Sequence, residues 1–325
     1  MDESYRNLLI KQQYRLYNDH AAVKLCHWMK ESMVRQRSCY KHDFYGIDSH
    51  RCLQMTPAIN ECSHMCQFCW RVQEKDFEVK DWAEPKDMLD NLIAQQRLLI
   101  SGFNGDSRVS KEMFREANEP NQVAISLAGE PITYPYLSEF IKECHRRKMT
   151  TFLVTNGTYP ERLAELNELP MQLYITVAAP NEEIYKKVCR PKIKDGWEKL
   201  MKTLELLPSL DTRTVIRHTL VKDLNMGWVE EYAKLDKIAD PDLIEPKGYV
   251  FVGGSRTRLS MNNMPSFDEI REFSSQLGSL VGKEIIKEKA DSRVVLLGTP
   301  GMETDVRKLH GWDSQRIMRN TISTI

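Results

Sequence analysis

Short apolar runs rich in β-branched residues alternate along the chain with longer amphipathic segments. Six runs have the length and composition of buried strands, and they cover residues 55–59, 122–127, 150–155, 172–179, 213–221 and 247–252. Six segments have helical periodicity with Pro, Gly, Asn or Asp at their ends, and they cover residues 86–100, 107–118, 136–148, 160–168, 195–206 and 227–239. This alternation predicts repeated βα units and a parallel sheet.

Six strands are fewer than the eight of a closed barrel, so the α/β pattern predicts a partial (β/α)6 barrel of the TIM type. We assign the barrel to residues 53–260. Residues 1–52 are predicted to form an N-terminal helical extension. Residues 261–325 are predicted to form a C-terminal extension packed on the barrel, with a helix, an apolar run at 293–298 and a polar tail. The three segments are expected to form a single globular unit.

The composition is that of a globular protein and does not indicate a particular binding partner. With 325 residues, 41% of them hydrophobic, the chain can bury a large core. Lys+Arg and Asp+Glu both number 46, so net charge does not indicate a nucleic-acid partner, although local basic clusters can supply one. No apolar run approaches the ~20 residues of a membrane span, and the polar start is unlike a secretory signal. We therefore expect a soluble, cytoplasmic monomer.

Cys62, Cys66 and Cys69 lie close together in the run ECSHMCQFCW. The CxxxCxxC spacing supplies three thiolates to an iron–sulfur cubane and leaves one iron free to bind a chelating cofactor. A zinc site is the alternative, with His64 or Cys52 as the fourth ligand, because zinc also prefers thiolates. Structural zinc sites usually use paired CxxC motifs and four ligands, so the spacing favours the cluster.

Cys26, Cys39 and Cys52 form a second set, with twelve residues between successive members. Six of the eight cysteines crowd into the first quarter of the chain, which favours metal ligation over disulfides. Three unrelated buried thiols are the alternative, because free cysteine packs as a small hydrophobe. We predict a second 4Fe-4S cluster that also has one open iron. Cys144 and Cys189 have no other cysteine close to them in the sequence and are interpreted as structural.

Glycine-containing turns follow three of the predicted strands: AGEP at 128–131, TNG at 155–157 and VGGS at 252–255. Loops after the strands carry the chemistry in barrels of this kind. A glycine lets the backbone approach a ligand, and a neighbouring carboxylate can hold an ammonium group. Each turn taken singly is more often only a turn. Three at the same rim of the sheet predict a ligand site.

The CxxxCxxC run with an aromatic residue before its last cysteine, together with Gly-Glu-Pro and Thr-Asn-Gly at strand ends, resembles the radical S-adenosylmethionine (SAM) superfamily. The resemblance implies that the three cysteines hold a 4Fe-4S cluster whose fourth iron is chelated by the amino and carboxylate groups of SAM. One-electron reduction then cleaves SAM to a 5′-deoxyadenosyl radical. The implied cofactor contacts are Gly129 and Glu130 for the methionine amino group, Asn156 for the ribose region and Gly253 for the adenine region. Phe68, the aromatic residue before the last cysteine, is also implied to contact the cofactor.

Nearly the whole chain, including residues 27–71 and the run SLAGEPITYPYLSEFI, is similar to the archaeal tRNA 4-demethylwyosine synthases of wybutosine synthesis. This resemblance implies a radical SAM carbon–carbon lyase with two 4Fe-4S clusters facing one pocket. The implied substrates are phenylalanine tRNA carrying N1-methylguanosine at nucleotide 37 and pyruvate, whose carbons 2 and 3 close a third ring. Eukaryotic relatives carry a flavodoxin-like domain, for which this chain has no room before Cys26. We therefore expect an external electron donor such as flavodoxin or ferredoxin.

Lys41 is the candidate for holding pyruvate, because it lies two residues after Cys39 with Arg37 and His42 beside it. Burial or neighbouring cations that lower its pKa would expose the free amine needed for an imine. In one alternative, pyruvate is chelated by the open iron of the second cluster and Lys41 is only a cation near its carboxylate. In the other, Lys41 is a solvated lysine, as most lysines are.

RNA recognition is expected to splay out the reacting base from a single-stranded loop, because a stacked purine cannot bring its methyl group to a buried radical. Trp70 is available for stacking. Basic residues after predicted strands four and six are candidates for phosphate contacts, and these are Arg190, Lys192, Arg256 and Arg258. A solvated surface is the alternative for each cluster. His218, within a predicted strand, is interpreted as a core histidine.

Two other classes of function fit parts of this pattern. One is a different radical SAM enzyme with an auxiliary cluster, acting on RNA or on a peptide. Peptide-maturing enzymes of that kind place their extra cysteines after the barrel, whereas here the extra set precedes it. The other is a zinc-dependent RNA-binding protein, which would be colourless, whereas iron–sulfur clusters would make the protein brown.

Overall fold

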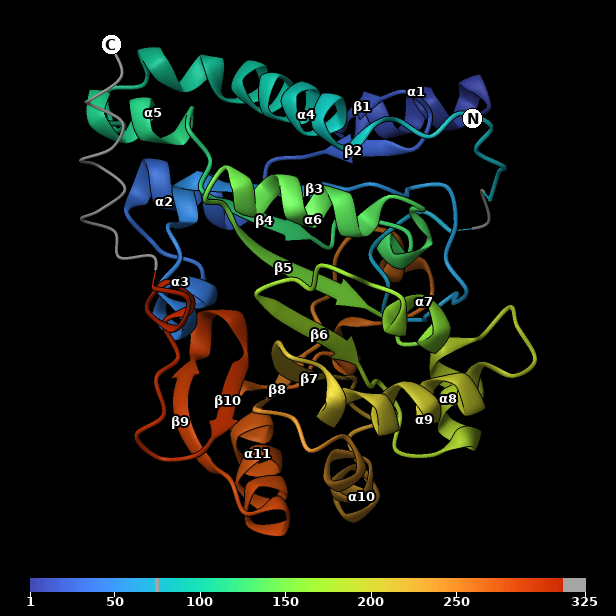
Figure 1. Cartoon of the computed structure of the whole chain (residues 1–325). Coiled ribbons are helices and arrows are strands. Elements are labelled where there is room, and N and C mark those ends of the chain that lie inside the picture. Colours follow the sequence, from blue (N-terminus) through green and yellow to red (C-terminus); the bar gives the residue numbers. More distant parts are fainter. Residues whose placement is uncertain (74–75, 312–325) are drawn as a thin grey trace.

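A ten-stranded sheet forms the centre of the computed structural model, which describes residues 1–73 and 76–311. Its strand order is β1-β2-β3-β4-β5-β6-β7-β8-β10-β9, so β1 and β9 form the two edges. Six neighbouring strands are parallel and follow in sequence order (Figure 1), namely β3 (Cys52–Thr56), β4 (Gln122–Ile125), β5 (Thr150–Thr155), β6 (Gln172–Thr176), β7 (Arg213–Leu220) and β8 (Leu243–Gly248). This order agrees with the predicted partial (β/α)6 barrel.

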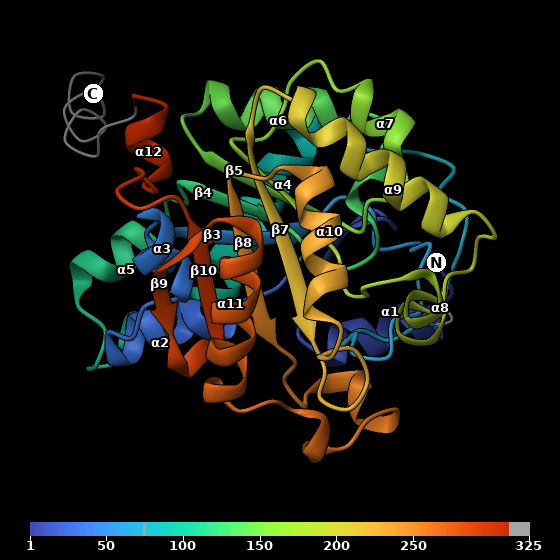
Figure 2. The ribbon, with the colours of Figure 1, turned by 90° about the horizontal axis from the view of Figure 1, so that it is seen from below.

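Helices join successive parallel strands, and several of them lie together along one side of the sheet (Figure 2). They are α4 (Pro85–Ile100), α5 (Lys111–Ala117), α6 (Leu137–Arg146), α7 (Pro160–Ala164), α8 (Glu182–Cys189), α9 (Gly196–Leu206) and α10 (Val229–Ala239). In α6 the buried residues Leu137, Phe140, Ile141 and Cys144 recur at helical spacing, which makes one face of that helix apolar. The periodicity therefore located this helix correctly.

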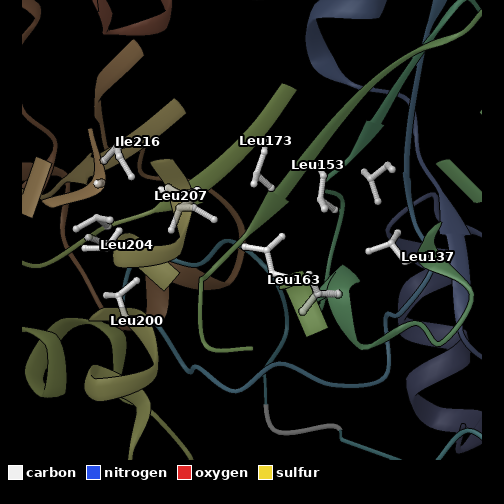
Figure 3. Packing of buried hydrophobic residues seen from close by; sticks show 14 of the residues in the cluster. Leu137, Leu153, Leu163, Leu173, Leu200, Leu204, Leu207 and Ile216 are labelled. Atoms are coloured by element: carbon white, nitrogen blue, oxygen red, sulfur yellow. The ribbon is translucent and has the colours of Figure 1, made fainter. Parts of the chain in front are cut away.

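Apolar side chains from strands and helices interlock on that side of the sheet. Leu153 of β5 and Leu173 of β6 are fully buried, and so is Leu204 of α9. Figure 3 shows these leucines directed into one cluster with Leu163 of α7 and Leu200 of α9. The central strands β4, β5 and β6 are almost entirely buried on both faces, as the strands of a parallel sheet covered on both sides usually are.

The N-terminal segment contains three helices and a short hairpin. The helices are α1 (Glu3–Lys11), α2 (His27–Arg35) and α3 (Tyr40–Tyr45), and the hairpin strands are β1 (Arg15–Tyr17) and β2 (Ala21–Val23). Strand β2 pairs antiparallel with β3 and extends the sheet. The helical prediction for residues 1–52 missed this hairpin, because strands of three residues are too short to give an alternating pattern.

The C-terminal segment adds helix α11 (Phe267–Val281), strands β9 (Glu284–Lys289) and β10 (Val294–Gly298), and the short helix α12 (Val306–Leu309). The apolar run predicted at 293–298 is confirmed as β10, which lies antiparallel between β8 and β9. The polar tail after residue 311 lies outside the described residues.

The strand predicted at 247–252 is displaced in the structure, because β8 ends at Gly248 and residues 249–252 begin the following loop. Glu245 and Lys247 made the true strand look polar, although Glu245 is fully buried. Within residues 1–73 and 76–311, no helix combines the length and apolarity that a membrane crossing requires.

Candidate active site

The cysteine loop after β3 borders a cavity of about 420 Å³ at the carboxyl ends of the parallel strands. Cys62, Cys66 and Cys69 all line this cavity as partly buried free thiols. Burial raises the pKa of the Cys62 thiol, and the nearby Glu130, Cys66 and Cys69 raise it further. Grouped thiols of this kind become thiolates when a bound metal supplies positive charge, so the three residues fit the predicted cluster.

Backbone contacts hold the cysteine loop in place from two distant parts of the chain. The amide of Gln67 donates to the carbonyl of Val188 at 2.9 Å, and the amide of Gly254 donates to the carbonyl of Trp70 at 2.8 Å. Arg258 donates to the carbonyl of Gln67 at 3.2 Å and also to that of Cys69. Arg258, predicted to contact phosphate, is therefore bound to the cysteine loop.

Glu130 is buried at the second glycine turn and forms the acidic corner of the cavity. Its carboxylate accepts hydrogen bonds from the amides of Asn156 at 2.9 Å and Ile132 at 3.4 Å. Burial raises the pKa of Glu130 to about 7. A ligand ammonium would favour the charged carboxylate, so this corner fits the amino group of SAM.

The other predicted cofactor residues surround the same cavity with one exception. Phe68, Gly129 and Asn156 line it, and the side-chain amide of Asn156 lies 3.6 Å from the Cys62 sulfur and 2.8 Å from the Ser63 hydroxyl. Gly253 is not among the lining residues. At its φ of +57° an added Cβ would lie 2.4 Å from the Trp70 carbonyl oxygen.

Gly129 lies where a side chain has no space, so Gly129→Ala is expected to damage the cofactor corner. Its φ is +65°, and an added Cβ would lie 1.8 Å from the carbonyl oxygen of Ala58. The left-handed backbone alone costs about 1–2 kcal/mol, and the clash requires the turn to move. We expect SAM affinity to fall at least about tenfold, measured by equilibrium dialysis. Gly102→Ala, which meets nothing within 4 Å, is the control and should bind SAM normally.

The second cysteine set also comes together in space. Cys26 and Cys39 immediately precede α2 and α3, with side chains that do not cap these helices, and Cys52 begins β3. Burial raises the pKa of Cys39 to about 12, with a further contribution from Cys26. Burial also raises the pKa of Cys52, and Cys26 again contributes. Cys26 therefore lies near enough to Cys39 and Cys52 to act on both electrostatically, although none of the three lines the cavity.

Lys41 is buried between aromatic rings, so it is not a solvated lysine. Its side-chain nitrogen lies 4.9 Å from the centre of the Phe152 ring and 5.0 Å from that of Tyr174. Burial lowers the pKa of Lys41, and the positive charge of Arg217 lowers it further. Both effects favour the neutral amine that imine formation requires.

Several functional groups escaped the sequence analysis. Glu245 is fully buried on β8, and the partly buried Arg217 of β7 and Lys247 of β8 lie near it. Charged residues at alternate positions of a buried strand were the signal that could have located them. Cys189, which was interpreted as structural, lies beside His64 and Cys66. The possible ligand atoms of these three residues are all within 4.8 Å of one another.

The group of His64, Cys66 and Cys189 is the best geometry for the zinc alternative among the described residues. Burial lowers the pKa of His64 to about 4, and its Nε2 already lies 2.6 Å from the Tyr185 hydroxyl. The group includes Cys66 but leaves Cys62 and Cys69 on the cavity wall without a role. An iron–sulfur cluster uses all three members of the CxxxCxxC run.

The basic residues predicted to contact tRNA lie around the rim in different settings. Arg190 and Arg256 are exposed, and Lys192 lines the cavity and pairs with Asp76. Trp70 is 36% exposed, which leaves part of its ring accessible for stacking. Their contacts with RNA stay predictions.

His218 is a core histidine, as interpreted from the sequence. It is fully buried, its Nδ1 lies 2.8 Å from the carbonyl oxygen of Val177, and its Nε2 lies 3.0 Å from Asp236. Both ring nitrogens thus have partners within the core, as buried polar groups normally do.

Two family models match the chain. The radical SAM superfamily model matches residues 56–235, and a model described as wyosine base formation matches residues 238–299. The S-adenosyl-L-methionine-dependent tRNA 4-demethylwyosine synthase of Pyrococcus abyssi is 49% identical over 304 residues, which cover 91% of this chain and 89% of that protein. The protein of the same name from Methanocaldococcus jannaschii is 39% identical over 304 residues, covering 91% and 96% of the two chains.

Two solved structures are similar over almost their whole length. A structure of TYW1 with a lysine-pyruvate adduct bound superimposes with a TM-score of 0.86 and 37% sequence identity, covering 94% of this chain and 99% of that one. A crystal structure of archaeal TYW1 gives a TM-score of 0.78 and 33% identity with the same coverage of both chains.

Proposed function

Because the chain belongs to the S-adenosyl-L-methionine-dependent tRNA 4-demethylwyosine synthases of the radical SAM superfamily, we propose that its cavity joins pyruvate to N1-methylguanosine 37 of phenylalanine tRNA. Membership of this family makes the chain a radical enzyme that acts on tRNA and uses SAM with a 4Fe-4S cluster. The observation that carries the proposal is the placement of all three CxxxCxxC thiols and the buried Glu130 carboxylate on one cavity.

On the SAM side, Cys62, Cys66 and Cys69 bind the 4Fe-4S cluster. When bound, the cluster supplies the electron that cleaves SAM to a 5′-deoxyadenosyl radical. Glu130 accepts the methionine ammonium, because its carboxylate is buried and faces the cavity. Asn156 serves the ribose region, positioned by its amide hydrogen bond to Glu130.

The remaining cofactor contacts come from Phe68 and from the loop at Gly253, which serves the adenine region. Phe68 lines the cavity beside the cysteines, and the Gly253 loop lies against Trp70. Phe68, as part of the cavity wall, helps to keep water from the reacting atoms, which a reactive radical requires.

On the pyruvate side, Cys26, Cys39 and Cys52 bind a second 4Fe-4S cluster and Lys41 binds pyruvate. The neutral side-chain amine of Lys41 attacks the carbonyl carbon, and the resulting carbinolamine loses one water to give an imine. The lysine-pyruvate adduct in the related TYW1 structure supports this chemistry, and the lowered pKa of Lys41 supports this residue as the amine.

The tRNA approaches the rim where Arg190, Lys192, Arg256 and Arg258 lie, and Trp70 stacks on a base. Arg256 and Arg190 are exposed to a polyanion, and Lys192 reaches from the rim to the cavity wall. Electrons for the reaction come from an external donor such as flavodoxin or ferredoxin.

The proposed reaction is tested by incubating the anaerobically purified protein with tRNA that carries N1-methylguanosine, pyruvate, SAM and dithionite. We expect 5′-deoxyadenosine in solution and 4-demethylwyosine among the nucleosides of the digested tRNA, both detected by mass spectrometry. Carbon-labelled pyruvate should place label at two carbons of the new ring. A protein with intact clusters that forms neither product would refute the proposed reaction.

A further inference from the structure

Four ionisable side chains meet beside the cavity on β7, β8 and α3. Glu245 and Lys247 are two residues apart on β8 and therefore face the same side of the sheet. Arg217 of β7 is in register with Glu245. Lys41 enters from α3, which lies near β9 and β10 in Figure 2.

The Glu245 carboxylate is already bound to neighbouring donors. It is fully buried, and Arg217 donates to it through Nη2 at 2.7 Å and Nε at 3.1 Å. Tyr45 donates to its other oxygen, and Tyr40 donates at 3.3 Å. One carboxylate with four hydrogen bonds has little capacity left for either lysine.

The two lysines have no carboxylate partner of their own within residues 1–73 and 76–311. Lys247 donates to the carbonyl of Ser292 at 2.7 Å and lies 4.8 Å from the centre of the Tyr40 ring. Lys41 lies over the rings of Phe152 and Tyr174. An ammonium group has three donors, so Lys247 has donors to spare.

Arg217 is paired with Glu245, so Lys247 is a cation without a carboxylate partner in this group, whether Lys41 is neutral or protonated. Cys26, Cys39 and Cys52, which would carry the negative charge of a second cluster, do not line the cavity wall on which Lys247 lies. Buried charge without a partner is costly, so the remaining charge favours a bound anion. Arg217 and Lys247 line the cavity, whereas Lys41 and Glu245 do not, so an anion in the cavity would meet Arg217 and Lys247.

We propose that Lys247 binds the carboxylate of the α-keto acid substrate, while Arg217, held in place by Glu245, adds positive charge beside it. The inference rests on the proposed use of pyruvate and assigns a second anchor to it. The site therefore selects an α-keto acid over a neutral ketone of the same shape. Burial lowers the pKa of Lys247 to about 8, and the charges of Arg217 and Lys41 lower it further, so the amines of Lys247 and Lys41 lie near one another.

If Lys247 had only a structural role, its replacement would have a different effect from the loss of a carboxylate anchor. Its hydrogen bond to Ser292 links β8 to the turn before β10, and losing that link would affect every ligand equally. A carboxylate anchor affects pyruvate and leaves pyruvamide, its neutral analogue, unchanged. Lys247→Gln removes the charge and still has a donor for Ser292, whereas Lys247→Arg keeps the charge.

The test measures binding of labelled pyruvate and labelled pyruvamide to the full chain with its clusters, by equilibrium dialysis without SAM or tRNA. The wild type should prefer pyruvate, and Lys247→Gln should weaken pyruvate binding at least about tenfold with pyruvamide unchanged. Lys247→Arg should recover most of the affinity. Lys287→Met is the matched control, because Lys287 also donates to backbone carbonyls, at Asp43 and Phe44, and does not line the cavity.

Equal affinity of the wild type for pyruvate and pyruvamide would overturn the inference, even if the Gln variant failed to fold. So would equal pyruvate affinity in the wild type and in Lys247→Gln. Borohydride trapping separates this result from failure of the proposed function. If pyruvate binds with the expected preference but Lys41 is never labelled, the imine is wrong and the carboxylate anchor stands.

Discussion

Replacing Lys41 with Met should abolish 4-demethylwyosine formation, with a rate at least about 10³-fold below that of the wild type. Met keeps the length and apolar stem that pack between Phe152 and Tyr174 but has no amine to attack pyruvate. SAM cleavage should continue, because Lys41 does not line the cavity wall that carries Cys62, Cys66 and Cys69. Mass spectrometry of the tRNA nucleosides and of 5′-deoxyadenosine measures the two reactions separately.

Lys142→Met, at an exposed position of α6, is the control and should retain both reactions. In the wild type, borohydride added with pyruvate should reduce the imine and leave a stable secondary amine on Lys41, located by peptide mass analysis. Unmodified Lys41 in a fully active enzyme would contradict the imine. It would favour pyruvate chelated to the open iron of the second cluster, with Lys41 as a nearby cation.

Replacing Cys62 with Ala should eliminate SAM cleavage and remove about half of the bound iron, because three thiolates are the fewest that hold this type of cluster. The Cys62 sulfur lies 3.6 Å from the Asn156 amide nitrogen and close to Glu130, so its loss also disturbs the SAM corner. Production of 5′-deoxyadenosine after dithionite reduction is the measurement. Cys144→Ala removes a fully buried thiol in α6 and should retain the iron. Normal SAM cleavage by Cys62→Ala would contradict the ligand assignment.

The sequence predicted strands most accurately where nearly all of their residues are of types that favour buried strands. Strand β5 was predicted at its observed bounds, because its sequence TTFLVT consists almost entirely of β-branched and aromatic residues. The prediction for strand β8 began four residues too late, because the charged residues Glu245 and Lys247 are unusual in a central strand. Their placement there depends on partners such as Arg217 that lie elsewhere in the sequence. Helix α8 was missed because it is short and carries charged residues on its outer face.

Local sequence also predicted the parts of the site that depend on spacing. Cys62, Cys66 and Cys69 lie within one loop, and Glu130 lies in the loop after the buried strand β4, so short-range pattern was sufficient to select them. The contacts of Cys66 with Cys189 and of Cys69 with Arg258 join residues that are far apart in the chain. Hydrophobic periodicity cannot predict such pairs, because it describes neighbouring residues, whereas these contacts arise from the order of the strands in the sheet.

The grouping of the charged side chains around Glu245 could not be predicted from the sequence, because it depends on the folded structure. Arg217, Lys247 and Lys41 come from β7, β8 and α3, and each would ordinarily be interpreted as solvated. The sheet register sets Arg217 opposite Glu245 and directs Lys247 to the same side. The sequence therefore selected Lys41 and the cysteine loop, whereas the grouping of Lys41 with Arg217, Glu245 and Lys247 became visible only in the tertiary structure.

The most direct test of the two-cluster site is the iron and sulfide content of the anaerobically purified, reconstituted protein. We predict about eight irons per chain in the wild type, as two cubane clusters require. A variant with Ala at Cys26, Cys39 and Cys52 should hold about four irons and still cleave SAM to 5′-deoxyadenosine. About four irons in the wild type, unchanged in this variant, would contradict a second cluster.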